Sequence, residues 1–117
     1  MPKDTRTLLY DIQKAISILN MNKENLTYEE FEVDETHTPA ILYELVIIGE
    51  AAGNIPQSIL TRYFVIPWRK IVDLRNILVH AYGTVNRRIV WDIVINEIAP
   101  LQETIAQMLT DLEKEAP

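Results

Sequence analysis

Residues 38–53 read TPAILYELVIIGEAAG and carry the strongest helical signal in the chain. Thr38 and Pro39 are typical of an N-cap and the first position of a helix, and Gly53 is a natural terminator. Apolar side chains between them recur on most helical faces: Ile41, Leu42, Leu45, Val46, Ile47, Ile48, Ala51 and Ala52. A helix that is apolar on nearly all sides is buried. We therefore expect a central helix over residues 38–53.

Helical periodicity also precedes this segment. Residues 5–21 place apolar side chains at a spacing of 3.6 residues, and Asp4 stands where an N-cap is expected. Thr27 followed by Glu30 is a capping-box pattern, which predicts a short helix running into the acidic stretch 29–35.

Proline, glycine and asparagine divide the second half of the chain. They predict a short helix over residues 56–63, a longer helix over 67–80 that is ended by Gly83, and a last helical region capped by Asn86. Pro100 should kink or break this last region. The fold class is therefore predicted to be all-α, an up-and-down bundle of four to five antiparallel helices.

Composition excludes several classes of protein. With 117 residues and 48 % apolar residues, the chain is expected to form one domain over residues 1–117 with a compact core. It has no run of 18 uncharged apolar residues, and its N-terminus lacks the apolar core of a signal peptide, which predicts a cytoplasmic protein. Without cysteine, and with only two histidines, no dedicated metal site is expected. Three scattered glycines cannot form a phosphate-binding glycine loop.

The net charge of −6 hides a strong asymmetry along the chain. Residues 61–90 carry six basic and one acidic side chain, whereas residues 1–60 carry four and ten, and residues 91–117 carry one and six. We call the cations of the middle segment the basic island: Arg62, Arg69, Lys70, Arg75, Arg87 and Arg88. Such a local excess favours a site for a polyanion. The alternative is a set of solvated helix charges that pair with acidic helices nearby.

Polar side chains interrupt the apolar end of the helix predicted over 67–80, where residues 75–82 read RNILVHAY. Asn76 and His80 are four residues apart and share a helical face, whereas Arg75 and His80 are about 140° apart around an ideal helix. A site shared between two subunits would bring the latter pair together. Tyr82 follows the helix, where an exposed turn could present its hydroxyl. The alternative is an ordinary helix end, at which His80 interacts with the helix dipole and Tyr82 packs.

This R-x4-H-x-Y segment resembles the motif of HEPN-domain proteins, in the form found in the HepT-like toxins. Three further stretches match that family in order and spacing. Residues 47–52, IIGEAA, resemble its I-G-E-A-A helix, and Ile66-Pro67-Trp68 resembles its P-W helix start. Val90-Trp91 with Pro100-Leu101 resembles its C-terminal pattern. Together these matches span most of the chain.

The resemblance implies a homodimeric, metal-independent endoribonuclease without a cofactor. It also implies the toxin half of a toxin–antitoxin pair, whose antitoxin is an MntA-like minimal nucleotidyltransferase. Carried over by position, Arg75 and His80 form the catalytic pair and Asn76 supports them. Tyr82 is then the residue that accepts AMP from the antitoxin.

The residue types suit this chemistry, because RNA supplies its own nucleophile in the 2′-hydroxyl. A histidine side chain titrates near neutral pH, so His80 can move the proton, and Arg75 can clamp the phosphate oxygens. The expected product is a 2′,3′-cyclic phosphate. Neighbouring cations are expected to bind the rest of the RNA: Arg69, Lys70, Arg87 and Arg88.

Four other side chains receive interpretations from their surroundings. Glu50, in the apolar central helix, should pair with an arginine of the basic island, either as a structural contact or to orient the catalytic pair. His37 stands in polar sequence and is expected at the surface. Trp68 and Trp91 lie in apolar helical registers, so we expect them in the core rather than as platforms for stacked bases.

Two departures from the family pattern leave an alternative open. Asp73 and Ala81 occupy positions where many relatives have glycine, and a carboxylate at 73 could weaken the phosphate contact of Arg75. The alternative is a HEPN module that binds RNA or a nucleotidyltransferase partner without cleaving. A third possibility, a purely structural helical adaptor, requires the basic island to be salt-bridged and the polar groups of the motif to be buried and satisfied.

Overall fold

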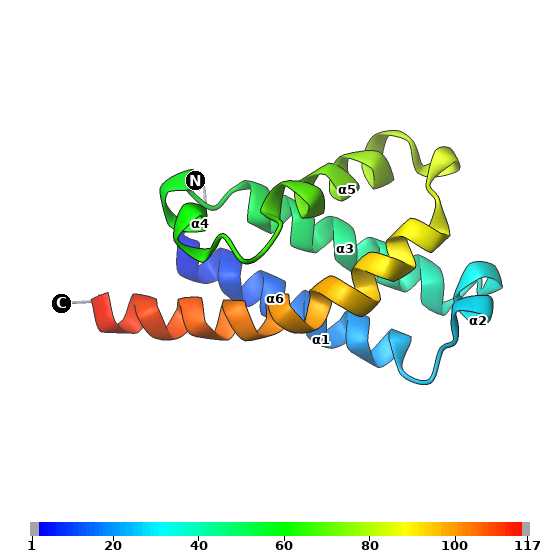
Figure 1. Cartoon of the computed structure of the whole chain (residues 1–117), viewed down its shortest axis with the longest axis horizontal. Helices are drawn as coiled ribbons and strands as arrows, with labels where there is room; N and C mark the ends of the chain where they lie inside the picture. The colour runs from blue at the N-terminus through cyan, green and yellow to red at the C-terminus, as the bar shows by residue number, and fades with distance from the viewer. Residues whose placement is uncertain (1–2, 116–117) are drawn as a thin grey trace.

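The computed structural model describes residues 3–115, which form helices and turns without a strand (Figure 1). Four helices are long: α1 (Thr5–Lys23), α3 (His37–Gly53), α5 (Trp68–His80) and α6 (Arg87–Glu115). Two are short, α2 (Tyr28–Val33) and α4 (Gln57–Leu60), and two 3₁₀ turns complete the set, η1 (Thr61–Tyr63) and η2 (Tyr82–Thr84). The predicted all-α class is confirmed. No helix within residues 3–115 is long and apolar enough to cross a membrane.

Helix α3 occupies the centre of the bundle, as its sequence predicts. It packs against α1 on one side and α5 on the other, while α6 packs against α1 (Figure 1). The fully buried side chains of α1 and α3 form the middle of the core: Leu9, Ile12, Ile16, Leu19, Ile41 and Ile48. Helix α6, with 29 residues at about 1.5 Å each, spans most of the 49 Å long axis of the molecule.

Side chains cap three helices as their sequences predict. Asp4 accepts a hydrogen bond from the backbone N–H of the third residue of α1 (2.8 Å). Thr27 and Glu30 form a reciprocal capping box at the start of α2, with bonds of 3.2 and 3.0 Å. Asn86 accepts from the backbone N–H two residues further on (2.9 Å) and so opens α6.

The start of α3 differs from expectation, because Thr38 is not its N-cap. The helix begins at His37, and the Asp34 carboxylate accepts hydrogen bonds from the backbone N–H groups of Thr36 (2.8 Å) and His37. The His37 ring contacts the same carboxylate (3.0 Å), and these bonds lower the pKa of Asp34 to about 2. Thr38 is instead buried and donates its hydroxyl to the Phe31 carbonyl (2.6 Å). His37 is exposed, as predicted.

The ends of the last two helices agree with expectation in part. Helix α5 ends at His80, as the predicted range 67–80 has it, but Gly83 does not end it, because the chain leaves helical geometry already at Ala81, whose φ is −143°. The turn η2 follows as a separate element, closed by the backbone N–H of Thr84 on the Ala81 carbonyl (2.9 Å). Pro100 lies inside α6 without breaking it, and the helix changes direction near its middle in Figure 1, which agrees with the kink rather than the break among the two predicted outcomes. Because Pro100 is exposed, the carbonyl that it leaves without a helical donor lies near solvent.

Trp68 lies in the core, as predicted, and Trp91 at its edge. The Trp68 side chain is 8 % exposed, and its indole N–H donates to the Tyr63 carbonyl (3.0 Å). Trp91 is half-buried and packs against Phe31 with ring centroids 5.0 Å apart. Neither indole is therefore a fully exposed ring on which an RNA base could stack.

Candidate functional site

The RNILVHAY segment, residues 75–82, covers the C-terminal end of α5 and the turn η2. Helix α5 turns Ile71, Leu74 and Leu78 into the core. This places the polar side chains of the segment outside that apolar stripe: Arg75 is half-buried, and Asn76 and His80 are exposed. The polar residues of the motif are thus at the surface, unlike those of the structural adaptor considered above.

Arg75 is the most constrained polar side chain of the segment. Its Nη2 lies 2.6 Å from the Glu50 Oε2 on α3, and its Nη1 donates to the Asn76 Oδ1 (3.0 Å). Among residues 3–115, its buried Nε has no hydrogen-bond partner. The expectation that Glu50 pairs with an arginine of the basic island is confirmed, and Glu50 and Asn76 together set the orientation of the guanidinium.

His80 and Tyr82 are more freely presented. His80 is the last residue of α5, and its ring forms no ion pair or side-chain hydrogen bond within the part of the chain that the structure describes. Tyr82 is 51 % exposed on η2, which agrees with the exposed turn that the sequence predicts and disagrees with the alternative in which this ring packs the helix end. An imidazole and a phenol are therefore available to ligands close to Arg75 in sequence.

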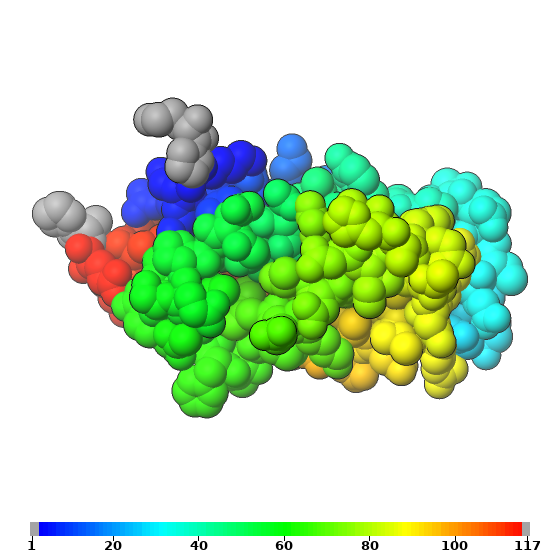
Figure 2. All heavy atoms as spheres, turned by 90° about the horizontal axis from the view of Figure 1, so that it is seen from above, coloured from blue at the N-terminus to red at the C-terminus, as the bar shows by residue number. Residues whose placement is uncertain are grey.

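The face that carries the segment is open to solvent. Figure 2 shows α5 in yellow-green across the middle of this face, with the yellow residues that follow it beside the cyan region of α2. Three apolar side chains in the segment or just after it are about half exposed: Ile77 (45 %), Val79 (45 %) and Ile89 (55 %).

A cavity of about 370 Å³ lies between α1 and α3 and reaches Glu50. Leu8, Ile47 and Ala51 give it apolar walls, and its polar lining residues are Lys3, Asp11, Glu50 and Asn54. Glu50 thus both lines the cavity and binds Arg75. The sequence offered no signal for this cavity, since its residues come from different helices.

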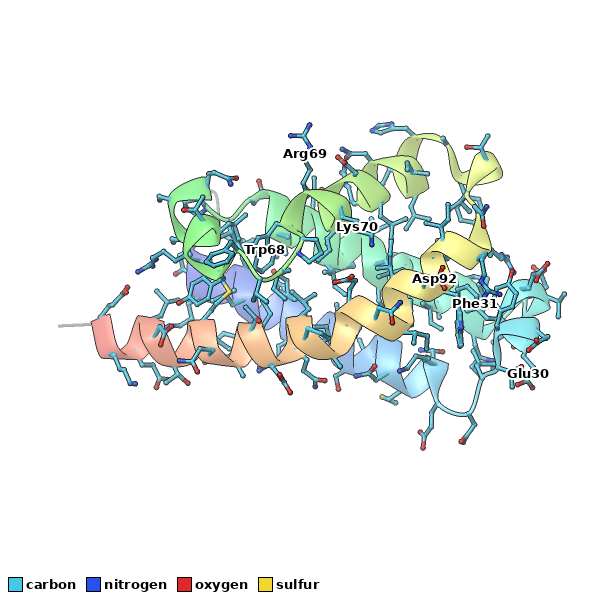
Figure 3. The ribbon with its side chains drawn as sticks, in the orientation of Figure 1. Glu30, Phe31, Trp68, Arg69, Lys70 and Asp92 are labelled. Atoms are coloured by element: carbon cyan, nitrogen blue, oxygen red, sulfur yellow. The ribbon has the colours of Figure 1, made fainter. Side chains whose placement is uncertain are left out.

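The basic island is spread over the surface rather than gathered into one patch. Arg69 is 94 % exposed and points away from the body, whereas Lys70 points toward α6 (Figure 3). Most cations of the basic island lie close to a carboxylate. The pairs are Arg62–Glu115 at 2.8 Å, Arg69–Asp73 at 4.0 Å, Lys70–Glu97 at 3.8 Å, Arg75–Glu50 at 2.6 Å and Arg88–Asp92 at 3.8 Å. Asp73 thus faces Arg69, not Arg75. Ion pairs of this exposed kind are weak, so they leave most of these cations able to exchange partners.

Arg87 has a structural contact that the sequence did not indicate. Its Nη1 donates to the carbonyls of Phe31 (3.3 Å) and Glu32 (2.8 Å) at the end of α2. These carbonyls lack helical donors because they lie in the last turn of α2. The neighbouring Arg88 lies over the ring of Tyr28, 4.5 Å from its centroid. Both arginines therefore fasten α2 to α6, and their contribution to RNA binding stays a prediction.

Comparison with known proteins points to one family. Residues 12–108 match the family model described as "Ribonuclease HepT-like". The protein named "Putative RNase MJ0127" of Methanocaldococcus jannaschii is 35 % identical over 116 residues, which cover 98 % of this chain and 96 % of that protein. The "Probable ribonuclease HepT" of Thermococcus cleftensis is 33 % identical over 102 residues, which cover 87 % of this chain and 93 % of that protein. No solved structure matches the chain.

Proposed function

Because this chain belongs to the HepT-like ribonuclease family, we propose that it is an endoribonuclease that cleaves RNA without a metal ion. The observation that carries the proposal is the exposed end of α5. There a guanidinium oriented by Glu50 and Asn76 precedes, by five residues, an exposed imidazole. Arg75 and His80 are the proposed catalytic residues, with Glu50 and Asn76 as positioning residues.

The proposed reaction is an internal phosphoryl transfer. The 2′-oxygen of a ribose attacks the adjacent phosphorus while the bond from phosphorus to the 5′-oxygen breaks, which leaves a 2′,3′-cyclic phosphate and a 5′-hydroxyl. A neutral His80 imidazole takes the proton of the 2′-hydroxyl, a contribution typically worth about 10² to 10⁴ in rate. The remaining N–H donors of Arg75 bind the non-bridging phosphate oxygens, on which negative charge increases.

A homodimer completes the proposed site. The five-residue spacing places Arg75 and His80 about 140° apart around an ideal helix, so a second copy is proposed to direct both residue types at a single phosphate. A symmetric pairing through the half-exposed Ile77, Val79 and Ile89 would bury apolar surface and bring two copies of the segment together. One His80 could then accept a proton while the other, in its protonated form, donates one to the leaving 5′-oxygen.

The proposal extends to regulation by modification of Tyr82. In the toxin–antitoxin arrangement that the family resemblance implies, a minimal nucleotidyltransferase transfers AMP to this hydroxyl in the cytoplasm. What supports Tyr82 as the acceptor is its exposure, 51 %, on a short turn directly after α5. An attached nucleotide would place an anionic phosphodiester and a bulky group where the RNA phosphate must bind, so charge repulsion and steric blockage act together.

RNA binding beyond the scissile phosphate is proposed for the exposed cations of the basic island: Arg69, Lys70, Arg87 and Arg88. Arg69 is the strongest candidate, since it is 94 % exposed and its contact with Asp73 is 4.0 Å long. Arg87 is the weakest, because it is already bound to backbone carbonyls.

The experiment that tests the function is cleavage of single-stranded RNA by the purified protein in the presence of EDTA. We expect cleavage that leaves 2′,3′-cyclic phosphate ends, detected by mass spectrometry, and its loss in Arg75→Ala and His80→Ala. Arg62→Ala is the matched control, because Arg62 also pairs with a carboxylate (2.8 Å) but lies outside the segment. Cleavage by His80→Ala at the wild-type rate would exclude the mechanism.

A second candidate function is a HEPN module that binds RNA or a nucleotidyltransferase without cleaving. The observation that favours it is the Arg75 guanidinium, which is already bound by Glu50 and Asn76 and so must share its donors with any phosphate. In the same assay this candidate predicts retention of RNA on a gel without new ends. Binding without cleavage would therefore select it over the ribonuclease.

A further inference from the structure

Helices α3 and α5 are in very close contact where Gly49 faces Arg75. A Cβ atom at Gly49 would lie 2.3 Å from the Cβ of Arg75, 3.0 Å from its Cγ and 3.1 Å from the carbonyl oxygen of Ile71. Non-bonded carbon atoms do not approach to 2.3 Å. The Cβ of Arg75 therefore occupies space that is free only because residue 49 has no side chain.

A larger residue at position 49 could not be accommodated by a side-chain rotation. The Cβ of Arg75 and the carbonyl of Ile71 are placed by the backbone of α5, so relief of the overlap requires the helix itself to move. Ordinary contact begins near 3.4 Å, which requires a displacement of about 1 Å at Arg75. Gly49 therefore fixes how close the backbone of Arg75 lies to α3.

The residue after Gly49 binds the guanidinium of the same arginine. The Glu50 Oε2 lies 2.6 Å from the Arg75 Nη2, and the Arg75 Nε is buried. A shift of α5 away from α3 would lengthen this ion pair and expose the Nε–H. We infer that Gly49 is a positioning residue, which holds Arg75 at the depth where Glu50 can orient its guanidinium. The catalytic consequence rests on the proposed function; the structural consequence does not.

Gly53 supplies a matched control on the same helix, one turn further on. A Cβ there would meet the two Cγ atoms of Val72 at 3.8 and 3.9 Å, which is ordinary van der Waals contact. Both Gly→Ala changes add the same methyl group to α3 on the side of α5. They differ in whether α5 must move.

The first measurement follows Arg75 directly and needs no activity. In ¹⁵N-labelled protein, the Nε–H of Arg75 should exchange slowly with solvent because it is buried. We expect Gly49→Ala to shift this resonance and accelerate its exchange at least tenfold, and Gly53→Ala to leave both unchanged. An Arg75 Nε–H signal that is the same in Gly49→Ala and wild type would overturn the inference.

The second measurement covers the outcome in which Gly49→Ala fails to fold. The double variant Gly49→Ala/Arg75→Gly removes the Cβ and Cγ atoms that the new methyl group would strike. Recovery of the thermal midpoint to that of Arg75→Gly alone supports the contact as the cause. A double variant as unstable as Gly49→Ala would contradict it.

The third measurement tests whether the position of Arg75 affects the rate of RNA cleavage. A displacement of about 1 Å at a group that contacts the reacting phosphate can cost about 100-fold in rate, so kcat of Gly49→Ala should fall by about that factor with folding retained. Gly53→Ala should stay within twofold of wild type. A folded Gly49→Ala with wild-type kcat would refute the positioning role. If the wild type cleaves no RNA, the proposed function fails while the exchange measurement still decides the role of Gly49.

Discussion

Substitution of Glu50 by glutamine removes the charge that faces Arg75 while it keeps the shape of the side chain. The ion pair is short, 2.6 Å, but the two side chains are 27 % and 54 % exposed. Pairs this open to solvent contribute about 0.2 to 1 kcal/mol to the free energy of unfolding. For a chain of this size, Glu50→Gln should therefore lower Tm by about 4 °C at most.

The effect of Glu50→Gln on cleavage should be much larger than its effect on stability. Removal of the partners that orient metal ligands typically costs about 10- to 100-fold in affinity or activity, and we expect a partner that orients a catalytic arginine to act at the low end of this range. Because Glu50 orients Arg75 but does not contact the phosphate, we expect kcat to fall about tenfold. Loss of a negative charge near the RNA should at the same time leave KM unchanged or lower it. Steady-state cleavage of a short fluorescent RNA at fixed ionic strength separates these two constants.

Glu115→Gln is the control for this experiment. The Arg62–Glu115 pair is similar in length, 2.8 Å, and in exposure, 49 % and 52 %, but its residues lie outside the RNILVHAY segment. The control should lose a similar amount of stability and keep its wild-type kcat. A Glu50→Gln variant that cleaves faster than wild type would refute the reasoning, because Glu50 would then compete with the phosphate for Arg75 rather than orient it.

Further predictions concern oligomeric state, catalysis, modification and acid stability. Light scattering at micromolar concentration should report a dimer, and a monomer that RNA does not shift would count against the shared site. His80→Ala should lower the cleavage rate by about 10² to 10⁴ while circular dichroism shows unchanged helix content, since this side chain is exposed. Intact-mass spectrometry after incubation with ATP, magnesium and the nucleotidyltransferase should show AMP additions on wild type and none on Tyr82→Phe; equal labelling would place the acceptor elsewhere. The pKa of Asp34 is lowered, chiefly by the side chain of His37, to about 2, so its contribution to stability is present above pH 4 and is lost as pH falls toward 2. Urea denaturation between pH 5 and 2 should show a smaller loss for Asp34→Asn than for wild type.

The sequence predicts most of the helices because their signals are local. The Asp4 cap, the Thr27–Glu30 capping box and the apolar centre of α3 each depend on residues within one or two turns. The sequence does not predict the correct first residue of α3, because two possible N-terminal caps, Asp34 and Thr38, compete. Thr38 and Pro39 form a good local pattern, but the Asp34 carboxylate reaches the backbone N–H groups first, and the buried Phe31 carbonyl takes the Thr38 hydroxyl.

The sequence predicts which residues belong to the candidate site, because most of them stand in one short motif. The spacing within RNILVHAY singles out Arg75, His80 and Tyr82, to which the family resemblance gives roles, and a carboxylate in an otherwise apolar helix singles out Glu50. The sequence does not show which residues of other helices each of these side chains contacts. The charge asymmetry, for example, indicates six cations in one segment, but only the fold shows that Arg87 is bound to carbonyls of α2.

The pair Gly49–Glu50 shows how two adjacent residues can act on one arginine in opposite ways. Gly49 acts by having no side chain, so that the Cβ of Arg75 can lie where a Cβ of residue 49 would stand. Glu50 acts through its side chain, which binds the guanidinium that this close approach brings within 2.6 Å. Neither effect replaces the other. Gly49→Ala would move Arg75 away from an intact carboxylate, whereas Glu50→Gln would leave Arg75 in place with a weaker partner. The two variants should therefore differ in Nε–H exchange, fast for Gly49→Ala and close to wild type for Glu50→Gln, even where both lower kcat.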